Sequence, residues 1–194
     1  MKKLLLHSCC GPCSSGVIGQ VVKDFDVTIL FYNPNIQPND EYLKRLEAQK
    51  TIIDKMNSEY GYNVKLIEVD YNPQEFFEVA KGLELEKEGG ARCEKCFYLR
   101  LDKTASFAKA NGYDTFTTTL SISPHKDFEL LNKIGKEMSD KHGVDYMCAN
   151  FKKNDGYLNS IKNSKKYEIY RQNYCGCIYS KKESEEYLKN KESR

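Results

Sequence analysis

Short apolar runs alternate with helical stretches over most of this chain, and that alternation constrains its fold more than any other feature. Each apolar run has the length of a strand, and most are followed by apolar residues at helical spacing. The expected strands are residues 2–7, 27–32, 63–71, 113–120 and 144–151. Strands that alternate with helices form a parallel sheet covered on both faces. We therefore expect an α/β protein with a doubly wound, mainly parallel sheet.

Start and stop signals place the helices between these strands. The first helix is expected around residues 17–25, with Ser14 and Ser15 available as caps. The second is expected to be capped by Asn39 and to stop at Gly61. Further helices are expected at residues 73–82, 93–111 and 127–142.

The length of 194 residues predicts one domain, with a strand–helix core at 1–151 and a helical extension at 152–194. The charged tail Lys181–Arg194 is expected to be a solvated helix. Forty per cent hydrophobic residues suffice for a core, but no run is long enough for a membrane span or a signal peptide. We expect a cytoplasmic protein with no membrane partner.

Eight cysteines are too few for a disulfide scaffold, and in the cytosol they indicate metal or redox chemistry. Cys148 stands alone in an apolar run and is expected to be a small buried side chain. The other seven form three groups, Cys9-Cys10-Gly-Pro-Cys13, Cys93-Glu-Lys-Cys96 and Cys175-Gly-Cys177.

The first group follows the first expected strand, where open α/β sheets bind their ligands. This loop lacks the glycine patterns of nucleotide-binding loops, which argues against an ATP-dependent protein. The spacing of Cys93 and Cys96 suits a zinc site as well as a [4Fe–4S] cluster. The adjacent pair Cys9-Cys10 is unusual for a structural zinc site and favours the cluster.

The third group has two interpretations. A disulfide between Cys175 and Cys177 would close a tight, strained ring, which is typical of redox-active disulfides, and Gly176 gives the backbone freedom it needs. Two further metal ligands are the alternative.

The chain around this group is basic. Residues 150–182 hold eight basic and two acidic residues, a local charge of +6, although the whole chain carries only +2. Five tyrosines are interleaved with them: Tyr157, Tyr167, Tyr170, Tyr174 and Tyr179. This pattern fits phosphate contacts and base stacking on RNA, or a plain charged surface over packed tyrosines.

Several motifs together resemble one family. They are His7-x-Cys-Cys-x-Pro, Asn33-Pro-Asn35-Ile, Cys93-x-x-Cys96, Ser123-Pro-His125-Lys126 and Tyr174-Cys-Gly-Cys177. In this order, over residues 4–180, they resemble the QueH-type epoxyqueuosine reductases, which do not use cobalamin. The resemblance implies a fold like that of the adenine-nucleotide hydrolases (HUP or PP-loop type). It also implies reduction of the epoxide of epoxyqueuosine at the tRNA wobble position, the last step of queuosine synthesis.

The resemblance also assigns the cysteines. Cys9, Cys10, Cys93 and Cys96 would hold a [4Fe–4S] cluster, and Cys175 with Cys177 would be the redox pair. Some members of the family carry aspartate at the position of Cys13, where it helps to hold a separate iron. Cys13 is therefore a candidate ligand of an additional iron ion.

The remaining expectations concern protons, tRNA and electrons. His7 and His125 are candidate proton donors, with a structural role as the alternative for each. Residues expected to contact the tRNA anticodon loop are Lys126, Lys165, Lys166, Tyr170, Arg171 and Tyr174. A separate electron donor is also required, and the sequence does not identify it.

Two other classes of protein fit parts of the pattern. One is a zinc-dependent tRNA-modifying transferase or sulfur carrier, which would be colourless where an iron–sulfur protein is brown. The other is a non-catalytic iron–sulfur scaffold or redox sensor, which would need no basic, tyrosine-rich stretch.

Overall fold

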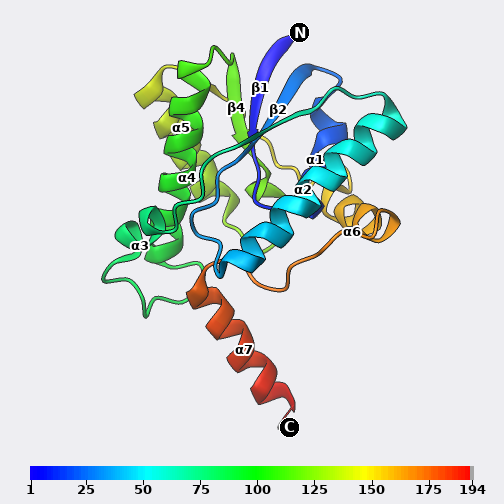
Figure 1. The fold of residues 1–194 in the computed structure, drawn as a ribbon. Coiled ribbons are helices and arrows are strands. Elements are labelled where there is room, and N and C mark those ends of the chain that lie inside the picture. The colour runs from blue at the N-terminus through cyan, green and yellow to red at the C-terminus, as the bar shows by residue number, and fades with distance from the viewer. Residues whose placement is uncertain (193–194) are drawn as a thin grey trace.

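The fold is a five-stranded, all-parallel sheet with helices on both faces, as seen in a computed structural model that describes residues 1–192 (Figure 1). The strands are β1 (Lys2–His7), β2 (Phe25–Phe31), β3 (Lys65–Glu68), β4 (Thr115–Thr118) and β5 (Asp145–Tyr146). The helices are α1 (Gly11–Val21), α2 (Asn39–Tyr60), α3 (Gln74–Ala80), α4 (Ala91–Ala110), α5 (Phe128–His142), α6 (Gly156–Lys166) and α7 (Ile178–Glu192), with one 3₁₀ turn, Thr119–Ile122. The expected α/β class is confirmed.

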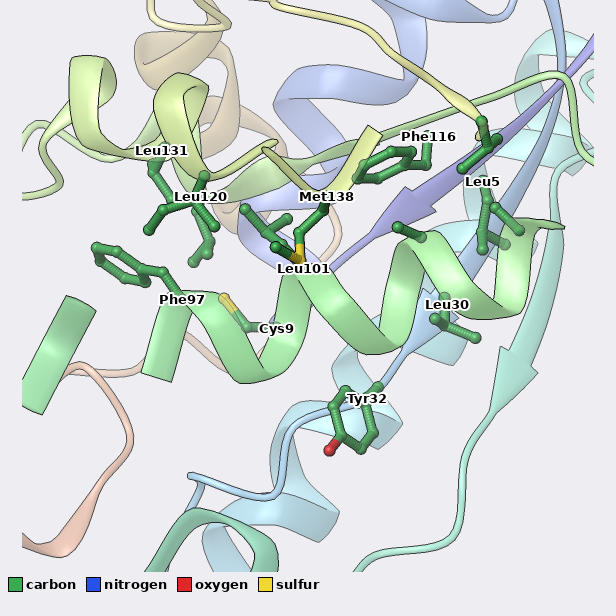
Figure 2. Close-up of a cluster of buried hydrophobic side chains, with 14 of the residues drawn as sticks. Leu5, Cys9, Leu30, Tyr32, Phe97, Leu101, Phe116, Leu120, Leu131 and Met138 are labelled. Atoms are coloured by element: carbon green, nitrogen blue, oxygen red, sulfur yellow. The ribbon is translucent and has the colours of Figure 1, made fainter. Parts of the chain in front are cut away.

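Alternate residues of the strands enter two separate hydrophobic cores. Leu5 of β1 faces a core that includes Leu101 of α4 and Leu131 of α5, and Figure 2 shows these side chains together. Its neighbour Leu4 faces the other core, against Ile18 of α1 and the apolar side of α2. This two-residue period is what a strand covered on both faces requires.

The strand order β3-β2-β1-β4-β5 puts β1 at the centre of the sheet. The chain runs outward from β1 through β2 to β3, and then returns to the other side of β1 to form β4. His7 pairs with Leu30 of β2 and with Thr118 of β4, so these three strands end at one level. Ligands of doubly wound sheets bind where the direction of winding reverses, here beyond the ends of β1 and β4.

Helix stops follow the sequence more closely than helix starts do. Gly61 and Gly143 end α2 and α5 in the left-handed conformation, as glycine at this position favours. Asp127 caps α5 by accepting a hydrogen bond from the Leu130 amide. The expected caps Ser14 and Ser15 are wrong, because α1 begins earlier, at Gly11, and encloses both.

Two other starts differ slightly from expectation. Asn39 is the first helical residue of α2 and the preceding Pro38 is its cap. The helix expected from Cys93 begins two residues earlier, at Ala91, so that Cys93 lies inside its first turn.

The C-terminal part contains α6, which packs on α1, and α7, which extends away from the rest of the fold (Figure 1). A β-carbon on Gly16 of α1 would lie 2.4 Å from the Gly156 carbonyl oxygen, so the two helices meet at glycines. The expected tail helix is present as part of α7, and residues 193–194 of that tail lie outside the described residues.

Cys148 is exposed, so its expected burial is wrong. Strand β5 is only two residues long, and the chain has left the sheet before it reaches this cysteine. No helix in residues 1–192 combines the length and apolar character that crossing a membrane requires.

Candidate active site

The first thiol group lies in the turn between β1 and α1. Cys10 is the cap of α1 and Cys13 lies in its first turn, near the positive end of the helix dipole. Hydrogen bonds with Cys10 and Cys9, together with burial, nevertheless raise the pKa of Cys13. The sulfur atoms of Cys9 and Cys10 are 4.0 Å apart, and Gln172 donates a hydrogen bond to the Cys10 sulfur at 3.0 Å. Hydrogen bonding with Cys10, and then with Cys13, holds the pKa of Cys9 well below its usual range.

The second thiol group occupies the start of α4. Cys93 lies in the first turn, and its sulfur accepts a hydrogen bond from the Gly89 amide at 3.2 Å. Cys96 follows one turn later and is buried, which raises its pKa to about 12. Two helix N-termini, of α1 and α4, therefore present thiols to the same edge of the sheet.

The third thiol group is a loop that precedes α7 and is bound to the region around the start of α2. Arg45 of α2 donates to the carbonyl oxygens of Cys175 at 2.9 Å and Tyr174 at 3.1 Å. The backbone amide of Gln37 donates to the Gly176 carbonyl at 2.8 Å, and the side-chain oxygen of Gln37 accepts from the Ile178 amide. These four hydrogen bonds fix the loop backbone. Cys175 and Cys177 are both free thiols here.

Arg100 of α4 is a fully buried cation between the three groups. Burial alone would lower the pKa of Arg100. Negative charge on Cys96, Cys9 and Cys175 outweighs burial and raises this pKa. Its Nε donates to the Cys96 carbonyl, and its Nη2 has no hydrogen-bond partner. No carboxylate within residues 1–192 forms an ion pair with it. A buried guanidinium without a counter-charge is costly, so its surroundings favour negative charge on the sulfurs.

A small cavity and a large pocket meet at this point. The cavity is lined by thiols of the second and third groups, together with Arg100. The pocket has a volume of about 730 Å³ and is lined by Cys9, Cys13 and side chains of the C-terminal part. Cys175 and Arg100 line both spaces, so they form the boundary between them.

The two expected proton donors differ in their surroundings. His7 is fully buried, and its ring nitrogens lie 2.9 Å from Thr118 Oγ1 and 3.1 Å from the Tyr32 carbonyl oxygen. It does not line the pocket, and its contacts are those of a structural histidine. His125 is exposed and lies on the pocket wall.

Three of the residues expected to contact tRNA line the pocket: Lys126, Arg171 and Tyr174. The Arg171 guanidinium lies over the ring of Tyr157, 5.6 Å from its centre. Lys126 is largely buried and forms an ion pair with Glu88 at 2.7 Å, so its charge is already partnered.

The other three lie outside the pocket lining. Tyr170 donates to Glu41 at 2.7 Å, at the start of α2. Lys165 and Lys166 occupy the last turn of α6, where Lys166 pairs with Glu59 and Lys165 is exposed. Contact of these residues with tRNA stays a prediction.

Sequence reasoning missed the polar residues that support the thiols, chiefly Arg45, Arg100, Glu88 and Gln172. Arg100 carried a signal, because it follows Cys96 by one helical turn on the apolar side of α4. Arg45 and Gln172 carried no signal of a role at the thiols, since the residues of the thiol groups that they contact are distant in sequence.

The site offers sulfur donors in three groups and one buried cation. No set of three or more metal-ligating side chains in residues 1–192 is already drawn together around a single point. Sulfur donors beside a buried cation nevertheless suit an anionic metal–thiolate centre, because Arg100 would balance its charge. Cys9, Cys10, Cys93 and Cys96 stay predicted ligands of such a centre, and Cys13, at the pocket wall, stays a predicted ligand of an additional iron ion.

Curated proteins of one name match most of this chain. The chain is 42% identical over 180 residues to Epoxyqueuosine reductase QueH of Staphylococcus epidermidis, covering 92% of this chain and 76% of that protein. It is 41% identical to the protein of the same name from Streptococcus pyogenes serotype M1, covering 92% and 70%. A solved structure, described as a predicted subunit of tRNA methyltransferase from Methanocaldococcus jannaschii, has a TM-score of 0.45 at 11% identity, covering 75% of this chain and 66% of that one.

A family model described as Epoxyqueuosine reductase QueH matches residues 4–183, which include all three thiol groups. The chain therefore belongs to the epoxyqueuosine reductase QueH family.

Proposed function

We propose that this protein is an epoxyqueuosine reductase, an oxidoreductase that converts epoxyqueuosine at the tRNA wobble position to queuosine. One observation carries the proposal most directly. Three thiol groups that are far apart in sequence meet around Arg100 at the wall of a pocket of about 730 Å³. This is within the usual size range of small-molecule pockets, ~300–1,000 Å³, and suits a single nucleoside.

The reaction requires two electrons and two protons, and the oxygen leaves as water. A [4Fe–4S] cluster, when bound, supplies single-electron transfer. In this proposal Cys9, Cys10, Cys93 and Cys96 hold the cluster, Arg100 balances its charge, and Cys13 is the ligand of an additional iron ion. Cys175 and Cys177 store two electrons as a dithiol and pass through a disulfide when they release them.

The pocket wall would position the substrate and supply its protons. His125 is the better placed of the two expected proton donors, because His7 is enclosed by its own hydrogen bonds. Arg171 and Tyr174 would contact the anticodon loop, whose wobble base must leave its stack to reach the pocket. A tRNA substrate and a separate electron donor would place the activity in the cytoplasm.

The test is an iron and zinc count, an absorption spectrum and a turnover assay on protein purified without oxygen. We expect bound iron and a brown colour. We also expect epoxyqueuosine in tRNA to lose one oxygen atom, which mass spectrometry of the nucleosides detects. Cys93→Ala and Cys96→Ala should lose the visible absorption, because a missing thiolate leaves a cluster under-ligated. Cys148→Ala is the matched control, since this exposed thiol lies outside the site.

Stoichiometric zinc without iron, in a colourless protein, would instead favour a zinc-dependent transferase. Iron without turnover on tRNA would favour an iron–sulfur scaffold or sensor.

The double variant Cys175→Ser with Cys177→Ser separates a redox pair from a ligand pair. A redox pair predicts that iron stays bound while thiol-driven turnover is lost, and loss of iron would make these residues ligands.

A further inference from the structure

The two thiols of the third group have unequal surroundings. Cys177 is 6% exposed and packs among Phe76, Ala80 and Cys96, and it lines only the inner cavity. Cys175 is half-buried and lines the large pocket as well. A molecule in the pocket would therefore meet the sulfur of Cys175 first.

A chain of hydrogen bonds connects the backbone of Cys175 to Lys126. Its amide donates to Ser180 Oγ at 3.1 Å, and the Ser180 hydroxyl donates to Glu88 Oε2 at 2.9 Å. The other oxygen of Glu88 accepts from Lys126 Nζ at 2.7 Å. Lys126 and Cys175 both line the large pocket, and the charge of Cys175 raises the pKa of Lys126. One end of this chain of hydrogen bonds holds the backbone of Cys175, and the other holds a positive charge beside its sulfur.

The Lys126 ammonium has little contact with water, since its side chain is 8% exposed. Burial alone would lower the pKa of Lys126, but the charges of Cys175 and Glu88 outweigh burial and raise it. The lysine therefore stays charged. Positive charge beside a partly exposed cysteine is the usual setting of a reactive thiol.

We propose that Cys175 is the outer thiol of the Cys175–Cys177 pair, the one that exchanges with a small thiol reductant in the pocket, and that Lys126 and Glu88 are its positioning residues. The inference rests on the proposed redox role of this pair, but it does not depend on the identity of the tRNA substrate. It gives Lys126 a role at the dithiol in place of a phosphate contact.

The exchange balances with two equivalents of a monothiol. A thiolate of the reductant attacks the Cys175 sulfur, the Cys175–Cys177 bond breaks, and the electron pair leaves on Cys177. The Ser180 amide, at 3.4 Å from that sulfur, and the N-terminus of α7 stabilise the leaving thiolate. A second thiolate then attacks the reductant's own sulfur in the mixed disulfide. Cys175 is released beside Lys126, and the reductant leaves as its disulfide.

The test follows mixed-disulfide formation with glutathione disulfide by mass spectrometry. It uses full-length protein with its metal content intact, in a Cys148→Ser background that removes the exposed thiol. Cys177→Ser leaves only Cys175 of the pair, and Cys175→Ser leaves only Cys177. We expect Cys175 to be modified at least about tenfold faster. Equal rates, or a faster Cys177, would overturn the order of the two thiols.

The role of Lys126 is tested in the Cys177→Ser background. Lys126→Met should slow modification of Cys175 by about tenfold, whereas Lys126→Arg keeps the charge and should restore most of the rate. Lys136→Met removes an exposed lysine on α5 and should leave the rate unchanged. An unchanged rate in Lys126→Met, with its stability checked by urea unfolding, would remove Lys126 from the mechanism. None of these rates involves tRNA. The proposed order of the two thiols is therefore tested independently of the proposed epoxide reduction.

Discussion

Arg45 Nη1 donates to the carbonyl oxygen of Cys175 at 2.9 Å, which joins the second turn of α2 to the Cys175-Gly-Cys177 loop across 130 residues of chain. The same guanidinium donates from Nε to Glu41 at 2.7 Å, and its side chain is fully buried. A buried charge of this kind is stable only with all its partners in place. The position of the Cys175-Gly-Cys177 loop is therefore fixed by the folded core.

Removing the Arg45 side chain should destabilise the whole protein and not only the Cys175-Gly-Cys177 loop. Arg45→Met leaves Glu41 buried without its cation and two loop carbonyls without donors, and we expect a loss of ~3–5 kcal/mol in the free energy of unfolding. Urea unfolding measures it. Lys44→Ala, on the same helix, breaks only an exposed pair at 3.5 Å and should change stability by less than ~0.5 kcal/mol. Similar losses in both variants would contradict a structural role for Arg45.

Gly176 should not tolerate a side chain. Its φ of +140° lies in the region that favours glycine, and an added β-carbon would come within 3.1 Å of Ile36 and 3.2 Å of Arg45 Nη1. Gly176→Ala should lower the free energy of unfolding by ~1–3 kcal/mol.

Gly19→Ala is the matched control, because this glycine is inside α1 with only the Tyr62 hydroxyl at 4.0 Å. It should raise stability by ~0.5–1 kcal/mol. Opposite signs in urea unfolding are the expected result. A neutral Gly176→Ala would show that the loop can move away from α2.

Arg100 should stabilise bound iron and contribute little to the stability of the metal-free protein. Arg100→Met removes the cation that balances the thiolates, so iron should be lost to a chelator roughly tenfold faster, equivalent to ~1.4 kcal/mol. Without metal the same change replaces a buried charge by an apolar side chain and should leave the free energy of unfolding unchanged or higher. Arg100→Lys keeps the charge and serves as control. Equal iron release from parent and Arg100→Met would contradict the balancing role.

The basic surface of α6 should contribute to tRNA affinity through its charge. Lys165→Glu with Lys166→Glu should weaken binding and flatten its dependence on salt, because fewer counterions are released. Lys23→Glu is the control, since it precedes β2 at the opposite edge of the sheet from the pocket. Affinities at two salt concentrations decide the matter. If the α6 variant binds like the parent, this face is only a solvated surface.

Tyr174 should contribute through its ring. Tyr174→Leu removes the stacking surface at the pocket wall, and tRNA affinity should fall by ~1–3 kcal/mol. Tyr174→Phe keeps the ring and loses only the hydrogen bond to the Gln37 carbonyl at 2.7 Å, so it should bind nearly as well as the parent. Equal losses of tRNA affinity in the two variants would show that Tyr174 acts by holding the loop through its hydroxyl group and not by stacking on a base.

The sequence predicted the sheet because β1 and β2, strands of six and seven residues, each contain a short apolar run, and local patterns of this kind are read directly from the chain. It overextended β5, where only two residues pair with β4. An edge strand has one neighbour, so its length depends on that neighbour and not on its own composition. The same edge left Cys148 exposed where an apolar run had suggested burial.

By itself, the sequence determined the α/β class, the carboxyl edge of the sheet as the place of the site, and the three thiol groups. These depend on short spacings, and the backbone geometry within a strand or a helical turn fixes what such spacings mean. Only the tertiary structure decided which charges stand beside the thiols. Arg45 reaches Cys175 across 130 residues of chain, Lys126 reaches Glu88 across 38, and Arg100 shares the pocket wall with Cys9; such contacts follow from how helices pack on the sheet. Local sequence gives a signal only for a near partner, as for Arg100 one turn after Cys96, and none for partners at such distances.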